Sequence, residues 1–193
     1  MPSPISRKEN LQMPIIGQLL SVCKPIYVSR GDLTSTRKTI DIITAHARAP
    51  ETYPQIMIFP EGTNSNRKAL LKFKPGAFIP GVPVQPVLLR FKMWDTITWT
   101  FDGSNILLLM YLTLCQIQIQ MEVDYLPVYT PNADEKANAL LFAQNVQNFM
   151  ARNLRIPSTN LTYENGVLYD LAISLGLPKN TGMFEIGNSM SRS

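Results

Sequence analysis

The turn at residues 59–63, with the sequence FPEGT, constrains the fold of this chain more than any other feature. It directly follows the apolar run 56–58, and an apolar run that stops at Pro and Gly predicts a buried strand ending in a tight turn. In α/β folds, ligands tend to bind beyond the carboxyl ends of strands. Four cations follow the turn: Arg67, Lys68, Lys72 and Lys74. Together these features predict a pocket for a phosphorylated ligand at a sheet edge.

The composition predicts a globular protein with an anionic partner. A length of 193 residues is enough for one domain with its own core. The hydrophobic fraction of 45% and the charged fraction of 17% are typical of a globular protein. The net charge of +4 favours contact with nucleic acid, a phospholipid surface or a phosphate-bearing cofactor. Nucleic acid is the weakest of these, because no recognition motif is visible and the basic residues are not interleaved with aromatic ones. We therefore predict no nucleic-acid partner.

The cysteines and the apolar runs limit the other classes of site. Cys23 and Cys115 lack the number and spacing of a disulfide framework or a metal site, so we interpret them as buried thiols in a reducing compartment. No calcium loop is visible, and no metal site is predicted. The longest apolar run, 106–115, is too short for a membrane span, which takes about 20 residues. It is either a core segment, which we favour, or an interfacial one.

Strand and helix signals alternate along the chain, which predicts a single α/β domain whose mixed central sheet is flanked by helices. The motif Asn132–x–x–Glu135 resembles a helix capping box. Helices are expected over 15–20, from Asp32 or Thr34 to about Arg48, from Asn132 to about Leu154, and over 163–175. Strands are expected over 25–28, 55–59, 82–91 (made irregular by its prolines), 96–101 and 119–125.

This pattern divides the chain into four consecutive parts. Residues 1–14 are expected to form an irregular N-terminal segment. Residues 15–131 form the α/β core, 132–176 a C-terminal helical part, and 177–193 a tail.

Three segments of this core resemble, in family order, motifs of the glycerolipid acyltransferase (PlsC-like) family. FPEGT at 59–63 is similar to the third motif, VPVQPV at 82–87 to the fourth, and VSR at 28–30 stands at the place of the second. The longer run 72–87, KFKPGAFIPGVPVQPV, resembles the lysophosphatidylcholine acyltransferase and lyso-PAF acetyltransferase branch. The resemblance covers roughly residues 3–175 and implies the glycerol-phosphate acyltransferase-like fold.

The resemblance also implies that the catalytic pair is missing. In that family a His-x4-Asp motif before the second motif supplies the general base and its orienting carboxylate. No histidine precedes Arg30, so we expect a chain that is N-terminally incomplete, and we assign no catalytic residue. His46 and Glu51 have the same spacing, but they follow the second motif and Pro50 breaks the helical turn between them. We interpret His46 as an ordinary residue at a helix end.

The same resemblance implies roles for the residues of the turn. Arg30 would contact the phosphate of a lysolipid head group, unless it is a structural ion-pair partner. Glu61 and Gly62 would shape the acceptor pocket, where Gly62 lets the backbone approach the ligand closely. Glu61 paired with a nearby cation is the structural alternative. Thr63 would add a hydrogen-bond donor.

Three cations complete the candidate substrate-binding set. Arg67 would add further donors to the acceptor pocket. Lys72 and Lys74 would face either lipid head groups or the phosphates of CoA, and a solvated rim is the alternative for both.

By resemblance, the activity is transfer of an acyl group from acyl-CoA to a lysophospholipid, with lysophosphatidylcholine as the expected acceptor. Acyl-CoA is then a co-substrate, and no bound cofactor is expected. The expected partner is a phospholipid membrane surface at the cytosolic face of the endoplasmic reticulum or a related membrane, without a transmembrane span in this chain. The alternatives are a non-catalytic fragment that binds lipid surfaces, and an acyltransferase whose acceptor is lysophosphatidic acid.

Overall fold

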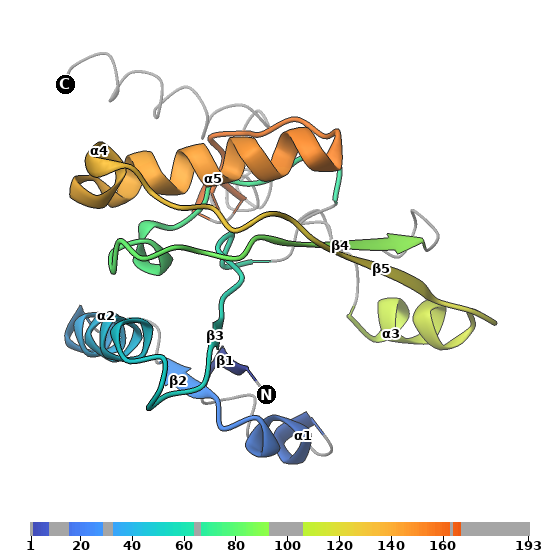
Figure 1. Ribbon diagram of the computed structural model, residues 1–193. Helices are drawn as coiled ribbons and strands as arrows, with labels where there is room; N and C mark the ends of the chain where they lie inside the picture. The colour runs from blue at the N-terminus through green and yellow to red at the C-terminus, as the bar shows by residue number, and fades with distance from the viewer. Residues whose placement is uncertain are drawn as a thin grey trace, which may run out of the picture. The chain divides into compact units, whose positions relative to one another are not determined.

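The computed structural model describes residues 2–7, 16–28, 33–63, 67–92, 106–162 and 164–166 (Figure 1). Strands and helices alternate along these residues, so the predicted α/β class is confirmed. The elements are β1 (Ser3–Arg7), α1 (Ile16–Val22), β2 (Ile26–Val28), α2 (Leu33–Arg48), β3 (Ile56–Met57), the 3-10 turn η2 (Pro75–Ala77), β4 (Val87–Lys92), α3 (Ile106–Leu114), β5 (Gln120–Tyr125), α4 (Ala133–Ala137) and α5 (Ala139–Leu154).

The chain forms two compact units, each built from several stretches of sequence. The first contains Met1–Pro60, Phe73–Gln85 and Val128–Val146. The second contains Glu61–Lys72, Pro86–Pro127 and Gln147–Ser193. The four consecutive parts expected from the sequence stay a prediction.

A parallel sheet with the order β2-β1-β3 organises the first unit. The central strand is β1, in which Ile5 pairs with Ile26 of β2 and Ser3 pairs with Ile56 of β3. The expectation of an irregular segment over 1–14 is therefore wrong for Ser3–Arg7. This strand contains a proline and only one strong strand former, Ile5, so its extended form comes from pairing on both sides rather than from its own propensity.

An aromatic cluster forms the core of the first unit. The rings of Phe73 and Phe78 lie 6.3 Å apart, and the Phe78 ring meets that of Phe142 edge-on at 5.0 Å. Tyr129 also packs on Phe142, with the ring centroids 5.8 Å apart. Phe142 and Val146 of α5 are buried and complete this core.

The predicted capping box is confirmed, but the helix that follows it is interrupted. The backbone N–H of Glu135 donates to Oδ1 of Asn132 at 2.9 Å, and the backbone N–H of Asn132 donates to Oε2 of Glu135 at 2.8 Å. The single helix expected from Asn132 to about Leu154 ends and restarts at Asn138, which has an extended backbone. The Asn138 side chain caps the second piece by accepting hydrogen bonds from the N–H groups of Leu140 and Leu141.

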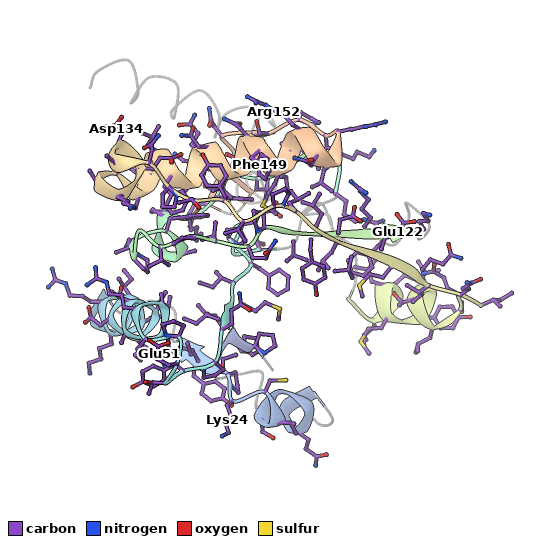
Figure 2. All side chains as sticks on the ribbon, in the orientation of Figure 1. Lys24, Glu51, Glu122, Asp134, Phe149 and Arg152 are labelled. Carbon is purple, nitrogen blue, oxygen red and sulfur yellow. The ribbon has the colours of Figure 1, made fainter. Side chains whose placement is uncertain are left out.

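An antiparallel pair, β4 and β5, runs through the second unit. Val87 lies opposite Tyr125 and Lys92 lies opposite Gln120. Lys92 forms an ion pair with Glu122, which is labelled on β5 in Figure 2, and Arg90 forms one with Asp124. The irregular start predicted for this strand is confirmed, because the ladder begins only at Val87, after the two prolines.

The apolar run 106–115 forms α3, and the preferred interpretation as a core segment is wrong. Leu107, Tyr111 and Leu114 are exposed, as is Cys115 directly after the helix, so the buried-thiol interpretation is also wrong for that cysteine. The run is apolar in nearly every position, so periodicity could not assign it a buried face. No helix among the described ranges has both the length and the apolarity to cross a membrane.

Two expected elements fall outside the described residues. The strand over 96–101 lies there entirely. Of the helix over 163–175, the structure describes only 164–166, which are helical.

Candidate functional site

The segment that leads into the FPEGT turn is shorter and more exposed than the sequence predicted. The strand expected over 55–59 is reduced to β3, and both Met57 and Phe59 are exposed, so the expectation of a buried strand is wrong. The reason is that β3 lies at the edge of its sheet and pairs with β1 over two residues only, Ser3–Ile56 and Pro4–Met57. The turn still follows a strand's carboxyl end, as predicted.

Glu61 is held by a backbone hydrogen bond. The N–H of Leu71 donates to Oε2 of Glu61 at 2.9 Å. Burial raises the pKa of Glu61, and the hydrogen bond from Leu71 opposes this shift in part. Within the described residues the partner of Glu61 is thus a backbone N–H and not a cation. This part of the structure does not support the alternative in which Glu61 serves as an ion-pair partner.

The peptide that binds Glu61 is itself held from the other side by Gln147 of α5. The buried side-chain amide of Gln147 donates to the carbonyl oxygens of Leu71 at 2.9 Å, Leu70 at 3.3 Å and Thr159 at 2.9 Å. Leu70 is also fixed by the segment after α5, since its N–H donates to Pro157 and its carbonyl accepts from Thr159. Leu71 therefore has its N–H on Glu61 and its C=O on Gln147.

Gln147 was not among the residues predicted to matter. A usable signal was present, because Gln147 lies one turn after Ala143 on the buried face, and a polar side chain on such a face must find hydrogen-bond partners.

Gly62 and Arg67 both have left-handed backbone conformations. Their φ angles are 66° and 65°. Glycine adopts this conformation without steric cost, whereas arginine does not. Nη1 of Arg67 donates to the carbonyl oxygen of Phe91 at 3.3 Å, which connects the residues after the turn to strand β4.

We expect Gly62→Ala to lower the free energy of unfolding by about 1–2 kcal/mol, because the added Cβ disfavours the left-handed conformation. Chemical denaturation measures this. Gly76→Ala is the matched control: a Cβ at Gly76 would meet nothing within 4 Å, so its effect should stay within about 0.5 kcal/mol or be slightly stabilising. Equal losses in the two variants would contradict this account of Gly62.

The remaining candidates are placed as follows. Thr63 is half-buried, and the side chains of Lys72 and Lys74 are exposed. The backbone N–H of Lys72 donates to the carbonyl oxygen of Leu161. Lys72 belongs to the second unit, together with Glu61, Gly62, Thr63 and Arg67, whereas Lys74 belongs to the first unit. Arg30 lies outside the described residues. Exposure suits both a phosphate contact and a solvated rim, so both alternatives stay open for the two lysines.

His46 lies in the last turn of α2, as interpreted from the sequence. Its ring stacks on Tyr53, with the ring centroids 4.1 Å apart, and its Nδ1 atom is buried without a hydrogen-bond partner in the described part of the chain. A catalytic base of the expected kind needs a carboxylate on that nitrogen. Among the described residues, no group of three or more His, Cys, Asp and Glu side chains is arranged to hold a metal ion.

Comparison with known proteins agrees with the motif pattern. The Acyltransferase family model matches residues 1–90. The chain is 48% identical over 186 residues to lysophosphatidylcholine acyltransferase 2 of Homo sapiens, covering 96% of this chain and 34% of that protein. It is 43% identical over 192 residues to lysophosphatidylcholine acyltransferase of Drosophila melanogaster, covering 99% of this chain and 36% of that protein.

A third relative gives the same picture. Lysophosphatidylcholine acyltransferase 1 of Homo sapiens is 46% identical over 186 residues, covering 96% of this chain and 35% of that protein. The chain thus spans about a third of the length of these relatives. No solved structure matches. The resemblance seen in the motifs is confirmed, and the chain belongs to the acyltransferase family, on its lysophosphatidylcholine acyltransferase branch.

Proposed function

We propose that this chain is part of an enzyme that transfers an acyl group from acyl-CoA to a lysophospholipid, with lysophosphatidylcholine as the acceptor. The observation that carries the proposal is the 43–48% identity to three proteins named lysophosphatidylcholine acyltransferases over nearly the whole chain. The turn with Glu61 and Gly62 lies inside the matched segment, because the family model extends to residue 90.

The reaction joins the acceptor hydroxyl to the acyl carbonyl carbon, breaks the C–S bond of the thioester and releases the thiol of CoA. The hydroxyl proton must pass to a general base, which the family resemblance places in a His-x4-Asp motif. We assign no residue of this chain to that role.

We assign binding and orientation to this chain. The backbone N–H of Leu71 already donates to Oε2 of Glu61. We therefore propose that Oε1 accepts a hydrogen bond from the lysophospholipid. The left-handed turn at Gly62 lets the ligand approach the backbone closely. The cationic residues, by the same proposal, neutralise the phosphate of the lysolipid and those of CoA; these residues are Arg30, Arg67, Lys72 and Lys74. Thr63 adds a hydroxyl donor.

The proposed setting follows from the chemistry of the acceptor. A lysophospholipid partitions into membranes, so we propose a phospholipid membrane surface as the partner. The family resemblance implies that this surface is the cytosolic face of the endoplasmic reticulum or a related membrane. Acyl-CoA is the co-substrate, and the proposed reaction requires no bound cofactor.

A chimera tests the proposal. This chain replaces the matching third of human lysophosphatidylcholine acyltransferase 2, and transfer from labelled acyl-CoA to lysophosphatidylcholine is measured on membranes. We expect the chimera to keep transfer within about tenfold of the parent. We expect the isolated 193-residue chain to be slower by about 10²–10⁴-fold, the usual contribution of a general base.

The alternatives give different results in the same assay. A folded, membrane-bound chimera without transfer would contradict the proposal and favour a non-catalytic lipid-surface protein. Faster transfer to lysophosphatidic acid than to lysophosphatidylcholine would show that lysophosphatidic acid is the acceptor. Full turnover by the isolated chain would show that it contains its own base.

A further inference from the structure

Helix α3 presents an apolar stripe to solvent. Leu107, Tyr111 and Leu114 have exposed fractions of 69%, 64% and 82%. Together with exposed Met110 they occupy positions i, i+3, i+4 and i+7, which share one face of a helix. Ile117, just beyond the helix, is fully exposed at 106%. In a soluble protein such a stripe normally packs against the core.

The segment around this stripe carries no charge. From Ile106 to Ile119 the sequence contains no Asp, Glu, Lys, Arg or His. Of the polar side chains in the helix, Thr113 donates its hydroxyl to the carbonyl of Leu109 at 2.7 Å, so it would bring no unpaired donor into an apolar medium. Tyr111 has the apolar body and polar tip typical of residues at a membrane interface. Helix α3 itself can therefore leave water at little electrostatic cost, whereas the amide side chains of Gln116 and Gln118 follow it in the sequence.

The dimensions of α3 favour insertion parallel to a membrane surface. Its nine residues give a helix about 14 Å long at 1.5 Å per residue, against about 30 Å for the hydrocarbon core of a bilayer. The side of the helix away from the stripe, with Leu109 and Leu112, is half-buried and also apolar. Fluid acyl chains can surround such a helix on several sides, whereas a protein groove covers one side.

We propose that α3 and Ile117 form the surface by which this chain docks on the bilayer that holds its acceptor lipid. The identity of the occupant rests on the proposed function, because a lysophospholipid acceptor resides in a bilayer. The charges of strands β4 and β5, which belong to the same unit as α3, pair with one another, Arg90 with Asp124 and Lys92 with Glu122. The contribution of this surface to docking therefore requires no anionic lipid, unlike attachment by a basic patch.

The two cysteines allow a direct test. Cys115 is exposed and directly follows α3, whereas Cys23 lies after α1 in the other unit. Cys23→Ser and Cys115→Ser each leave one thiol for an environment-sensitive fluorophore. On addition of phosphatidylcholine vesicles, we expect the emission of the label at Cys115 to shift to the blue and to be quenched by brominated acyl chains. The label at Cys23 should not respond.

Substitutions test the same surface without a label. We expect the double variant Leu114→Gln/Ile117→Gln to lower the vesicle partition coefficient by about tenfold or more, because two apolar side chains no longer enter hydrocarbon. The matched control is Val128→Gln/Leu140→Gln, which changes two exposed apolar residues of the other unit and should shift partitioning less than about twofold. Circular dichroism verifies that both variants fold.

Three results would overturn this assignment. The first is equal quenching of the labels at Cys23 and Cys115, and the second is an equal loss of vesicle partitioning in the two double variants. The third is protection of Cys115 by self-association without lipid, which would show that this surface binds a second copy of this chain. Loss of acyl transfer in the chimera leaves the docking result unaffected, since vesicle binding involves no turnover.

Discussion

Replacing Gln147 by Leu is expected to lower the free energy of unfolding by about 2–4 kcal/mol. Leucine is similar to glutamine in size, but it lacks the side-chain amide that donates to three backbone carbonyls. Leu70 keeps its hydrogen bonds from Thr159, so the loss falls mainly on the carbonyls of Leu71 and Thr159. Each buried acceptor left without a partner costs about 1–3 kcal/mol.

Gln144→Leu is the matched control for this prediction. Gln144 lies on the same helix, α5, but its side chain is exposed, so the same substitution should change stability by less than about 0.5 kcal/mol. Urea denaturation of both variants makes the comparison. Similar midpoints for the two would show that the buried amide does not hold the Leu70–Leu71 peptide.

Replacing Glu61 by Gln is expected to separate stability from function. The amide oxygen of Gln still accepts the hydrogen bond from Leu71, while the burial of a negative charge is relieved, so stability at neutral pH should not fall. Transfer by the chimera should fall by about 10–100-fold, the usual loss when a hydrogen bond to a charged group becomes a neutral one. Glu61→Ala is the contrasting variant, because it leaves the N–H of Leu71 unpaired and should cost about 1–3 kcal/mol of stability.

The pH dependence of stability gives an independent check on Glu61. Because its pKa is raised in the folded state, the folded protein holds this proton more tightly than the unfolded chain does. The stabilisation from Glu61 is therefore complete below the ordinary value of 4.5 and is lost as the pH rises from there through the raised pKa. The difference in stability between the parent and Glu61→Gln should decline over that window and then stay constant. A difference that grows with pH would contradict a buried carboxyl group whose pKa is raised.

The sequence predicted those features whose chemistry is local. The capping box of Asn132 and Glu135, the strand Gln120–Tyr125 and the helix that ends at Arg48 all depend on residues a few positions apart. The family was likewise readable, because its motifs are short runs such as FPEGT. The helix break at Asn138 is also local, because the side chain of this residue caps the new helix, but the surrounding residues also fit one continuous helix.

Tertiary structure decided what depends on partners distant in the sequence. Ser3–Arg7 becomes a strand only because Ile26–Val28 and Ile56–Met57 supply its hydrogen bonds. Gln147 reaches Leu71 across 76 positions, and no local pattern encodes that contact. The exposure of α3 was equally hidden, since an apolar run specifies that water is avoided but not whether protein or lipid takes its place. Local hydrogen bonds and periodicity can be read along one segment, whereas burial is a property of the whole packed chain.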